Sequence, residues 1–197
     1  MTQSAKRIGL FGGSFDPIHN GHLAVANQVL SDSLVDEVIF VPVGLPWQKA
    51  KPSATAVHRK AMLELTIKDN PKFKLSTKEI KRDGFSYTID TVEEFLKEDI
   101  NLEINLILGV DAARSIPTWH RAEELINLVK ILVIAREEQN PPNFDFDFLF
   151  VKMPLVDISS SGVRDNLKKG LAINHLVPNE VAAYISDHNL YKNSDVR

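Results

Sequence analysis

The chain has 197 residues, of which 44% are hydrophobic and 25% charged, so it is long enough to bury one sizeable core. The formal net charge of −3 without a clustered excess of Lys and Arg argues against a nucleic-acid partner, and no apolar run approaches the roughly 18 residues that cross a bilayer. Cysteine is absent, which excludes disulfides and thiolate chemistry, and no signal peptide is visible, so we expect a cytoplasmic protein without a membrane partner.

Short apolar runs rich in β-branched residues recur along the chain. They show no polar alternation, as strands covered on both faces should, and they predict strands at 8–11, 38–41, 104–108 and 131–134, with a shorter one at 148–151. The stretch 137–147, with its two prolines, is predicted to be a loop and is a candidate for mobility.

Helical patterns lie between these runs. Leu23, Ala26 and Val29 have the spacing of one buried helix face. Further helices are predicted around 57–67, 92–96, 122–129 and 181–185, the second of these capped by Thr88 or Asp90. Alternating strands and helices predict an α/β fold, a Rossmann-like doubly wound parallel sheet with helices on both faces and a small C-terminal helical portion. Ligands of such sheets bind beyond the carboxyl ends of the strands.

The first candidate site is the segment GGSFDPIHNGH, which follows the first predicted strand and precedes a helix. Gly12 and Gly13 let backbone N–H groups approach an anion, because no Cβ stands in the way, and the helix start presents further free N–H groups. His19 and His22 lie three positions apart, so both imidazoles can stabilise charge on one phosphate. Gly21 leaves room for a base or a ribose against the backbone.

Other readings of this segment exist. It also suits a tight turn with two surface histidines, in which Asp16 caps the turn; alternatively Asp16 orients His19. It is not a dinucleotide fingerprint, because the glycines do not fit G-x-G-x-x-G, and it is not a P-loop, because no G-K-[ST] follows. A zinc site would need a third ligand, which the sequence does not offer. The full context of strand, glycine pair, F-D-P, H-x-G-H and helix favours a phosphate site.

The second candidate site is the segment ISSSGVR, which precedes a helical run ending near Lys169. The hydroxyls of Ser159 and Ser160 can cap this helix, but together with its free N–H groups they can equally bind phosphate oxygens. Arg164 lies one turn into the helix and can hold the same anion with two parallel hydrogen bonds.

Together these two segments resemble the signatures of the nucleotidyltransferase α/β-phosphodiesterase superfamily, which is related in fold to the class I aminoacyl-tRNA synthetases. The resemblance implies that both histidines contact the phosphates of ATP, and that the second segment, about 140 residues further on, converges there to hold the β- and γ-phosphates. The ATP-binding residues it implies are Gly12, Gly13, Ser14, Phe15, His19, Gly21, His22, Gly109, Asp111, Ile158, Ser159, Ser160 and Arg164.

The segments between the two signatures point to the acceptor. PVGLPWQK, HRKAMLEL, IKRDGFSYT, GVD and PTW each resemble, in order and over nearly the whole chain, segments of bacterial nicotinate-mononucleotide adenylyltransferases. PWQK stands where many members carry P-P-H-K, so the roles of Trp47 and Gln48 stay open. The resemblance implies that residues 1–197 form a single nucleotidyltransferase domain, which joins the adenylyl group of ATP to nicotinate mononucleotide and gives deamido-NAD in NAD biosynthesis.

The residues implied for the acceptor suit its chemistry. Trp119 offers a flat face to a pyridine ring, although its residue type equally fits a core or loop position. Backbone N–H groups near Tyr87 and Thr88 suit the nicotinate carboxylate, although Tyr87 equally fits the core and Thr88 a helix cap. Lys49 reaches a phosphate or lies in a solvated loop, and Asp111 suits a ribose hydroxyl or a neighbouring loop. The set implied for nicotinate mononucleotide is Ser14, Lys49, Tyr87, Thr88 and Trp119.

We expect direct in-line attack of the acceptor phosphate on the α-phosphorus of ATP, without a general base, because the nucleophile is already an anion. The candidate catalytic residues are His19, His22, Lys49 and Arg164, assisted by Ser160. Mg²⁺ should accompany ATP, held by phosphates and water, so no metal ligand is assigned to the protein. The sequence leaves room for a homo-oligomer.

Three rival functions remain. Phosphopantetheine adenylyltransferases share both end signatures, but the longer chain, the SYT segment and the PTW loop argue against that acceptor. A nucleotide-binding regulator without catalysis is disfavoured by the intact H-x-G-H and S-x-x-x-R. A nucleic-acid ligand module, by analogy with the synthetases, is disfavoured by the acidic balance.

Overall fold

The computed structural model describes residues 5–48, 50–154 and 156–192 apart from residue 137. A six-stranded parallel sheet forms its centre, in the order β3-β2-β1-β4-β5-β6. The strands are β1 (Arg7–Gly13), β2 (Glu37–Pro42), β3 (Phe73–Leu75), β4 (Glu103–Gly109), β5 (Lys130–Arg136) and β6 (Leu149–Met153). This confirms the predicted α/β class and the doubly wound parallel sheet.

Strand β1 lies at the centre of the sheet. It pairs with β2 on one side, Ile8 opposite Glu37, and with β4 on the other, Ile8 opposite Ile104. The chain therefore winds outward in one direction through β2 and β3 and in the other through β4, β5 and β6. The strand order reverses between β1 and β4, so a ligand crevice is expected beyond their carboxyl ends. The segment GGSFDPIHNGH (residues 12–22), called the glycine–histidine loop below, begins there.

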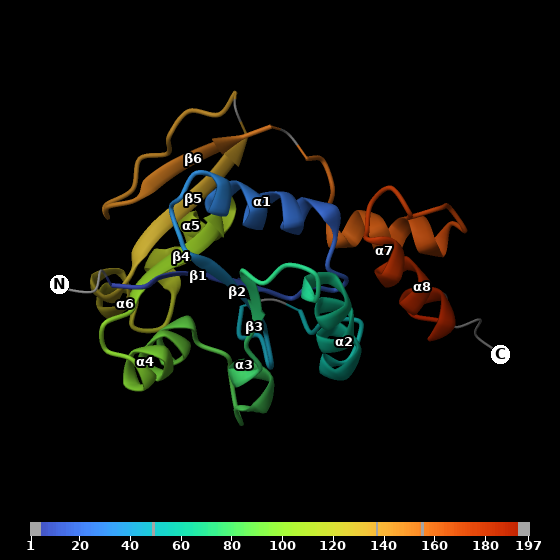
Figure 1. The fold of residues 1–197 in the computed structure, drawn as a ribbon, viewed down its shortest axis with the longest axis horizontal. Coiled ribbons are helices and arrows are strands. Elements are labelled where there is room, and N and C mark those ends of the chain that lie inside the picture. Colours follow the sequence, from blue (N-terminus) through green and yellow to red (C-terminus); the bar gives the residue numbers. More distant parts are fainter. Residues whose placement is uncertain (1–4, 49, 137, 155, 193–197) are drawn as a thin grey trace.

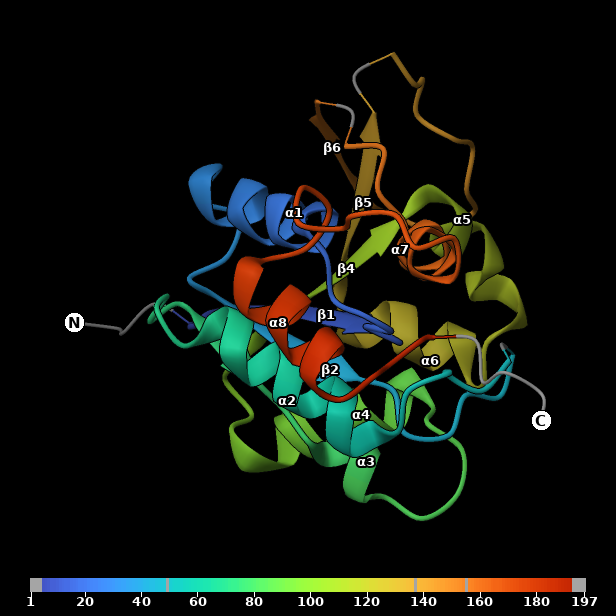
Figure 2. The ribbon, with the colours of Figure 1, turned by 90° about the vertical axis from the view of Figure 1, so that its right-hand side faces the viewer.

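Helices cover both faces of this sheet (Figure 1). They are α1 (Asn20–Ser31), α2 (Ala56–Ile67), α3 (Lys78–Lys81), α4 (Thr88–Glu98), α5 (Val110–Ser115), α6 (Ala122–Leu128), α7 (Ser160–Lys168) and α8 (Asn179–Asp187), with a 3-10 turn η1 at Ile116–Thr118. Figure 1 shows α7 and α8 at one side of the molecule and α4 and α6 at the other, and Figure 2 shows α8 beside α2.

Two apolar clusters, one on each face, hold these layers together. On the first face, side chains of α1, α2, α7 and α8, such as Val29, Met62 and Val163, pack on Phe40 and Ile107 of the sheet. On the second face, side chains of α4, α5 and α6 pack on the opposite sides of the same strands. Burial on both faces explains why the strands are rich in apolar residues without polar alternation. Because α7 and α8 contribute side chains to the first cluster, they belong to the same hydrophobic core as the sheet.

The structure differs from the sequence-based expectation in local detail. The sequence does not predict β3, α3, α5 or η1, which are three to six residues long and too short for a clear apolar period. The expected cap at Thr88 or Asp90 is wrong, because α4 begins at Thr88 and its N-cap is Tyr87. No helix in the described ranges is long and apolar enough to cross a membrane.

The crossover from β5 to β6 contains no helix in its described part. Three phenylalanines of this segment, Phe144, Phe146 and Phe148, alternate with exposed aspartates. Their rings contact one another and Phe150 of β6, and all four pack on the second apolar cluster. Residues 138–147, the described part of the loop predicted at 137–147, contain no helix or strand, which confirms a loop there.

Candidate active site

The first loop leaves β1 and enters α1 through a turn that Phe15 anchors. Phe15 has a φ of +46° and its ring is only 1% exposed, in the first apolar cluster. The ring meets His22 edge to face, with centroids 5.0 Å apart. The implied role of Phe15 in ATP binding stays a prediction, and it is one that only the backbone of this residue can fulfil, since the side chain lies in the core.

His19 and His22 stack on each other where α1 begins, with ring centroids 3.6 Å apart. The backbone N–H of His19 donates to Nδ1 of His22 at 3.2 Å, so we infer that the proton of the His22 ring is on Nε2. Burial lowers the pKa of His19 to about 4, and burial together with the neighbouring His19 lowers the pKa of His22 well below 6.5. Both rings are therefore neutral near pH 7 without ligand, and each can donate one N–H.

A cavity of about 410 Å³ opens in front of these histidines, at the carboxyl ends of β1 and β4. Its walls include the predicted residues His19, Gly21, His22, Gly109, Asp111 and Ile158. A Cβ at Gly21 would lie 3.0 Å from Nδ1 of His19, a buried atom without a hydrogen-bond partner among the described residues. Glycine thus keeps this wall flat, and the volume suits a nucleoside-sized group.

The second loop meets the first one directly. Ser160 Oγ donates to the carbonyl of Pro17 at 2.9 Å, and Arg164 Nη1 donates to the carbonyl of Asp16 at 2.6 Å. Ser159 caps α7 by accepting the N–H of Gly162 at 3.1 Å. The start of α7, with its free N–H groups, therefore lies beside the start of α1, and two positive helix ends face one region.

Two adjoining cavities lie on the other side of the glycine pair. The first, of about 160 Å³, is lined by Gly12, Gly13, Ser14, Glu79, Thr88 and Trp119, among others. The second, of about 380 Å³, shares Thr88 and Trp119 with it and adds Trp47 and Gln48. Trp119 donates its indole N–H to Ser115 Oγ at 2.8 Å, which fixes the ring at the shared wall. These cavities are predominantly apolar with a few polar groups, as small-molecule sites usually are.

The loops around these cavities are tied to each other. Gln48 Nε2 donates to Thr118 Oγ1 at 2.8 Å, so the PWQK loop is joined to the PTW loop. Trp47 meets Tyr87 with ring centroids 5.5 Å apart, and Tyr87 lies on His120 at 4.3 Å. Gln48 therefore has a structural contact that the sequence left open, and Tyr87 supports the rim with its ring.

Some predicted residues have other surroundings than expected. Lys49 lies outside the described residues. Asp111 is almost fully exposed and pairs with Arg114 at 3.2 Å. Asp16 is bound by the backbone N–H groups of Ser53 and Ala54, which is neither of the two roles considered for it.

Two buried polar residues and one half-buried tyrosine support the loops and are not singled out by the sequence. Arg59 on α2 is 1% exposed and donates to the carbonyls of Ser14 and Val43 at 2.8 and 2.7 Å. Glu79 on α3 accepts from Thr91 at 3.0 Å, and its pKa is raised to about 7, chiefly by burial. The third is Tyr191, whose hydroxyl donates to Asp16 Oδ1 at 2.8 Å. Nothing local in the sequence separates them from surface residues, because their partners come from distant loops.

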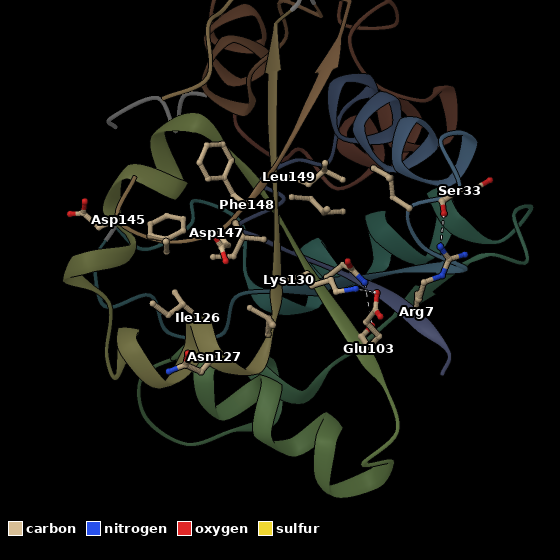
Figure 3. A pocket seen from close by; sticks show the side chains of 16 residues that line it. Arg7, Ser33, Glu103, Ile126, Asn127, Lys130, Asp145, Asp147, Phe148 and Leu149 are labelled. Carbon is tan, nitrogen blue, oxygen red and sulfur yellow. Dashed lines mark hydrogen bonds and ion pairs between the residues drawn. The ribbon is translucent and has the colours of Figure 1, made fainter. Parts of the chain in front are cut away.

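A separate cavity, of about 770 Å³, is lined by none of the predicted site residues (Figure 3). It lies at the amino ends of the strands, where Arg7, Glu103 and Lys130 begin β1, β4 and β5. Lys130 forms an ion pair with Glu103 at 2.9 Å, and Arg7 donates a hydrogen bond to the carbonyl of Ser33 at 2.7 Å. The candidate site is thus at the opposite, carboxyl end of the sheet, as the fold predicts.

The fold and this site define a nucleotidyltransferase of the α/β type. A family model described as cytidylyltransferase-like matches residues 10–166. A probable nicotinate-nucleotide adenylyltransferase of Dehalococcoides mccartyi is 40% identical, with 94% of this chain and 97% of that protein covered. The nicotinate-nucleotide adenylyltransferase of Bacillus subtilis is 37% identical, with 95% and 99% covered. The chain belongs to the cytidylyltransferase-like family and, within it, to the nicotinate-nucleotide adenylyltransferases.

Solved structures agree in fold. The nicotinic acid mononucleotide adenylyltransferase of Plasmodium falciparum, solved in complex with NaAD, superposes with a TM-score of 0.79 at 24% identity and covers 94% of this chain and 97% of its own. A putative nicotinate-nucleotide adenylyltransferase of Vibrio parahaemolyticus gives a TM-score of 0.70 at 19% identity, over 96% and 97% of the two chains.

Nucleotidyltransferases of this kind generally work with ATP and a divalent metal. Among the described residues, no group of three or more His, Cys, Asp or Glu side chains is placed to hold a metal ion. The histidine cavity is lined by the imidazoles of His19 and His22, whose N–H groups suit phosphate oxygens, and also by the side chains of Asp111 and Gln139.

Proposed function

We propose that this chain transfers the adenylyl group of ATP to nicotinate mononucleotide, releasing pyrophosphate and forming deamido-NAD. The observation that carries the proposal is the meeting of the two signature loops: Ser160 bonds to Pro17 and Arg164 to Asp16, beside the stacked histidines. The membership in the family named above supports the acceptor. We also treat residues 1–197 as one nucleotidyltransferase domain, since α7 and α8 share the core of the sheet.

In this proposal the triphosphate lies over the starts of α1 and α7, and the adenosine enters the 410 Å³ cavity. His19 and His22 donate to phosphate oxygens, and Ser159, Ser160 and Arg164 hold the β- and γ-phosphates. The remaining ATP contacts are assigned to the predicted set, Gly12, Gly13, Ser14, Phe15, Gly21, Gly109, Asp111 and Ile158.

Nicotinate mononucleotide occupies the two cavities beyond the glycine pair. Its pyridine ring stacks on Trp119, its carboxylate accepts backbone N–H groups at Tyr87 and Thr88, and Ser14 and Lys49 hold its phosphate. The two sites share Leu108 and Ala112 as wall residues, so the acceptor phosphate and the α-phosphate meet near the end of β4. The proximity of the two pockets allows direct attack.

The reaction needs no protein base. An acceptor phosphate oxygen forms a bond to the α-phosphorus while the bond to the β-phosphate oxygen breaks, and pyrophosphate leaves with that electron pair. His19, His22, Lys49 and Arg164 stabilise the charge that builds up on these oxygens. Mg²⁺ enters as part of the ATP substrate and neutralises phosphate charge.

Pyrophosphate release with a panel of acceptors tests the proposal. ATP and Mg²⁺ are offered with nicotinate mononucleotide, nicotinamide mononucleotide or phosphopantetheine, and deamido-NAD is identified among the products. We expect turnover with the nicotinate acceptor to exceed both others, since the amide would need a carbonyl partner. Faster turnover with phosphopantetheine would show the rival transferase, and tight ATP binding without turnover on any of them would show a regulator.

A further inference from the structure

Asp16, in the first loop, joins segments that are far apart in the sequence. Its carboxylate is buried, with only 3% of the residue exposed. It accepts the backbone N–H groups of Ser53 and Ala54 at 2.6 and 2.9 Å and the hydroxyl of Tyr191 at 2.8 Å. One carboxylate thus connects the H-x-G-H loop, the chain just after the PWQK loop, and the C-terminal segment.

The same residue also fixes Arg164 of the second signature. Arg164 Nη1 donates to the carbonyl of Asp16 at 2.6 Å and lies 3.6 Å from carboxylate Oδ2, which is beyond a normal hydrogen bond. The guanidinium is therefore held on the backbone side of Asp16, while three other donors occupy the carboxylate. Which of these two acceptors Arg164 prefers depends on how well the carboxylate is satisfied without it.

Tyr191 is held in place for this contact. It follows α8 in a left-handed conformation, with a φ of +61°, and the chain before it is tied back by Leu190 N–H donating to the carbonyl of Ile185 at 3.0 Å. Its ring is half-buried against the first apolar cluster. Burial and the adjacent Asp16 raise the pKa of the hydroxyl above its usual value of 10, so the group remains a donor.

We propose that Tyr191 is a positioning residue for the triphosphate side of the proposed reaction: by donating to Asp16 it keeps Arg164 aimed at the phosphates of ATP. Without this hydroxyl, the buried carboxylate loses one of its three donors and draws the guanidinium toward itself. Trp119 and Thr88, at the far wall of the acceptor cavities, form no hydrogen bond with Asp16, Arg164 or Tyr191 in the described part of the chain. The inference rests on the proposed ATP site, but not on the identity of the acceptor.

The test compares two Tyr→Phe substitutions in the C-terminal segment. Tyr191→Phe removes the bond to Asp16, while the matched control, Tyr184→Phe on α8, removes a bond of similar length to His58 Nδ1, 3.0 Å. We expect Tyr191→Phe to weaken binding of a non-hydrolysable ATP analogue, measured by calorimetry, by about tenfold, as loss of a charged hydrogen bond would. Tyr184→Phe should change it by less than about twofold, as an uncharged bond away from the site would.

A double-mutant cycle with Arg164→Lys separates positioning from general loosening. If Tyr191 acts through Arg164, Tyr191→Phe should have little further effect on ATP-analogue affinity in the Arg164→Lys background. An equal effect in both backgrounds, or equal losses in Tyr191→Phe and Tyr184→Phe, would overturn the proposal.

Thermal unfolding of each variant identifies a loss of fold, and Asp16→Asn serves as a second background in case Tyr191→Phe alone does not fold. It removes the carboxylate charge that would draw the guanidinium away from the phosphates, so Tyr191→Phe should have little further effect on analogue affinity in the Asp16→Asn background; a full additional loss there would contradict the inference. The calorimetry involves no acceptor. If the protein binds the ATP analogue but does not use nicotinate mononucleotide, the proposed acceptor is refuted, while the effect of Tyr191→Phe on analogue affinity can still be interpreted.

Discussion

Glu79 makes the stability of the protein depend on pH. Its carboxyl lies at the wall of the 160 Å³ cavity, where it accepts from Thr91 at 3.0 Å. Burial raises its pKa from 4.5 to about 7, against the opposing effects of Thr91, Arg82 and Ser86. The folded protein therefore binds more protons than the unfolded chain between these two pH values, and its stability falls as the pH rises through this window.

The size of this effect follows from the shift. One pKa unit corresponds to about 1.4 kcal/mol, so an ionised Glu79 costs the folded state about 3 kcal/mol above pH 7 relative to pH 4. Glu79→Gln keeps the shape and cannot ionise, so it should be more stable than the wild type at pH 8.5, and the difference should shrink toward zero near pH 4.5.

Urea unfolding from pH 4.5 to 8.5 measures this difference, because titration of other groups cancels between the two proteins. The control is Glu64→Gln, a substitution of an exposed carboxylate on α2 that pairs with Lys60, for which we expect a nearly pH-independent difference. If the curves of Glu79→Gln and the wild type stay parallel over the whole range, the buried carboxyl is not the source of the effect and the reasoning fails.

Three further substitutions test the site. His22→Ala should lower kcat by more than about 100-fold with nearly unchanged affinity for nicotinate mononucleotide, since an imidazole N–H facing the phosphates stabilises the transition state; near-normal turnover in steady-state assays would refute its assignment. Gln48→Ala should raise KM for nicotinate mononucleotide about tenfold while leaving KM for ATP unchanged, because it opens the clamp to the PTW loop; a change confined to the KM of ATP would contradict this role. Arg59→Met should lower the free energy of unfolding in urea by about 3 kcal/mol, since two buried loop carbonyls lose their donor; a loss below about 0.5 kcal/mol would show that water replaces the guanidinium.

The sequence predicts most strands of the sheet because strands that are buried on both faces need apolar residues along their whole length. The long inner strands are rich in apolar residues, with Asn105 of β4 as a buried polar exception, and the glycine–histidine loop begins where the first of these runs ends. Short elements such as β3 and α3 leave no such mark, since their few residues are held by neighbouring strands and loops rather than by a period of their own.

Motif residues and supporting residues differ in the same way. His19, His22, Ser160 and Arg164 could be selected because nearby glycines and helix starts show what they face. The contact between Tyr191 and Asp16 spans 175 positions, so only the tertiary fold reveals it. Even inside a motif, the sequence does not show which way a side chain points. Phe15 has a left-handed backbone conformation, and its ring lies in the core rather than toward the cavity.

A crystal structure with a non-hydrolysable ATP analogue bound tests most directly whether one triphosphate bridges both loops. We predict phosphate oxygens within hydrogen-bonding distance of His19 and His22 and, in the same molecule, of Ser160 and Arg164, with the adenosine in the 410 Å³ cavity. A triphosphate that contacts only one of the two loops, or that lies in the large cavity at the amino ends of the strands, would contradict the account.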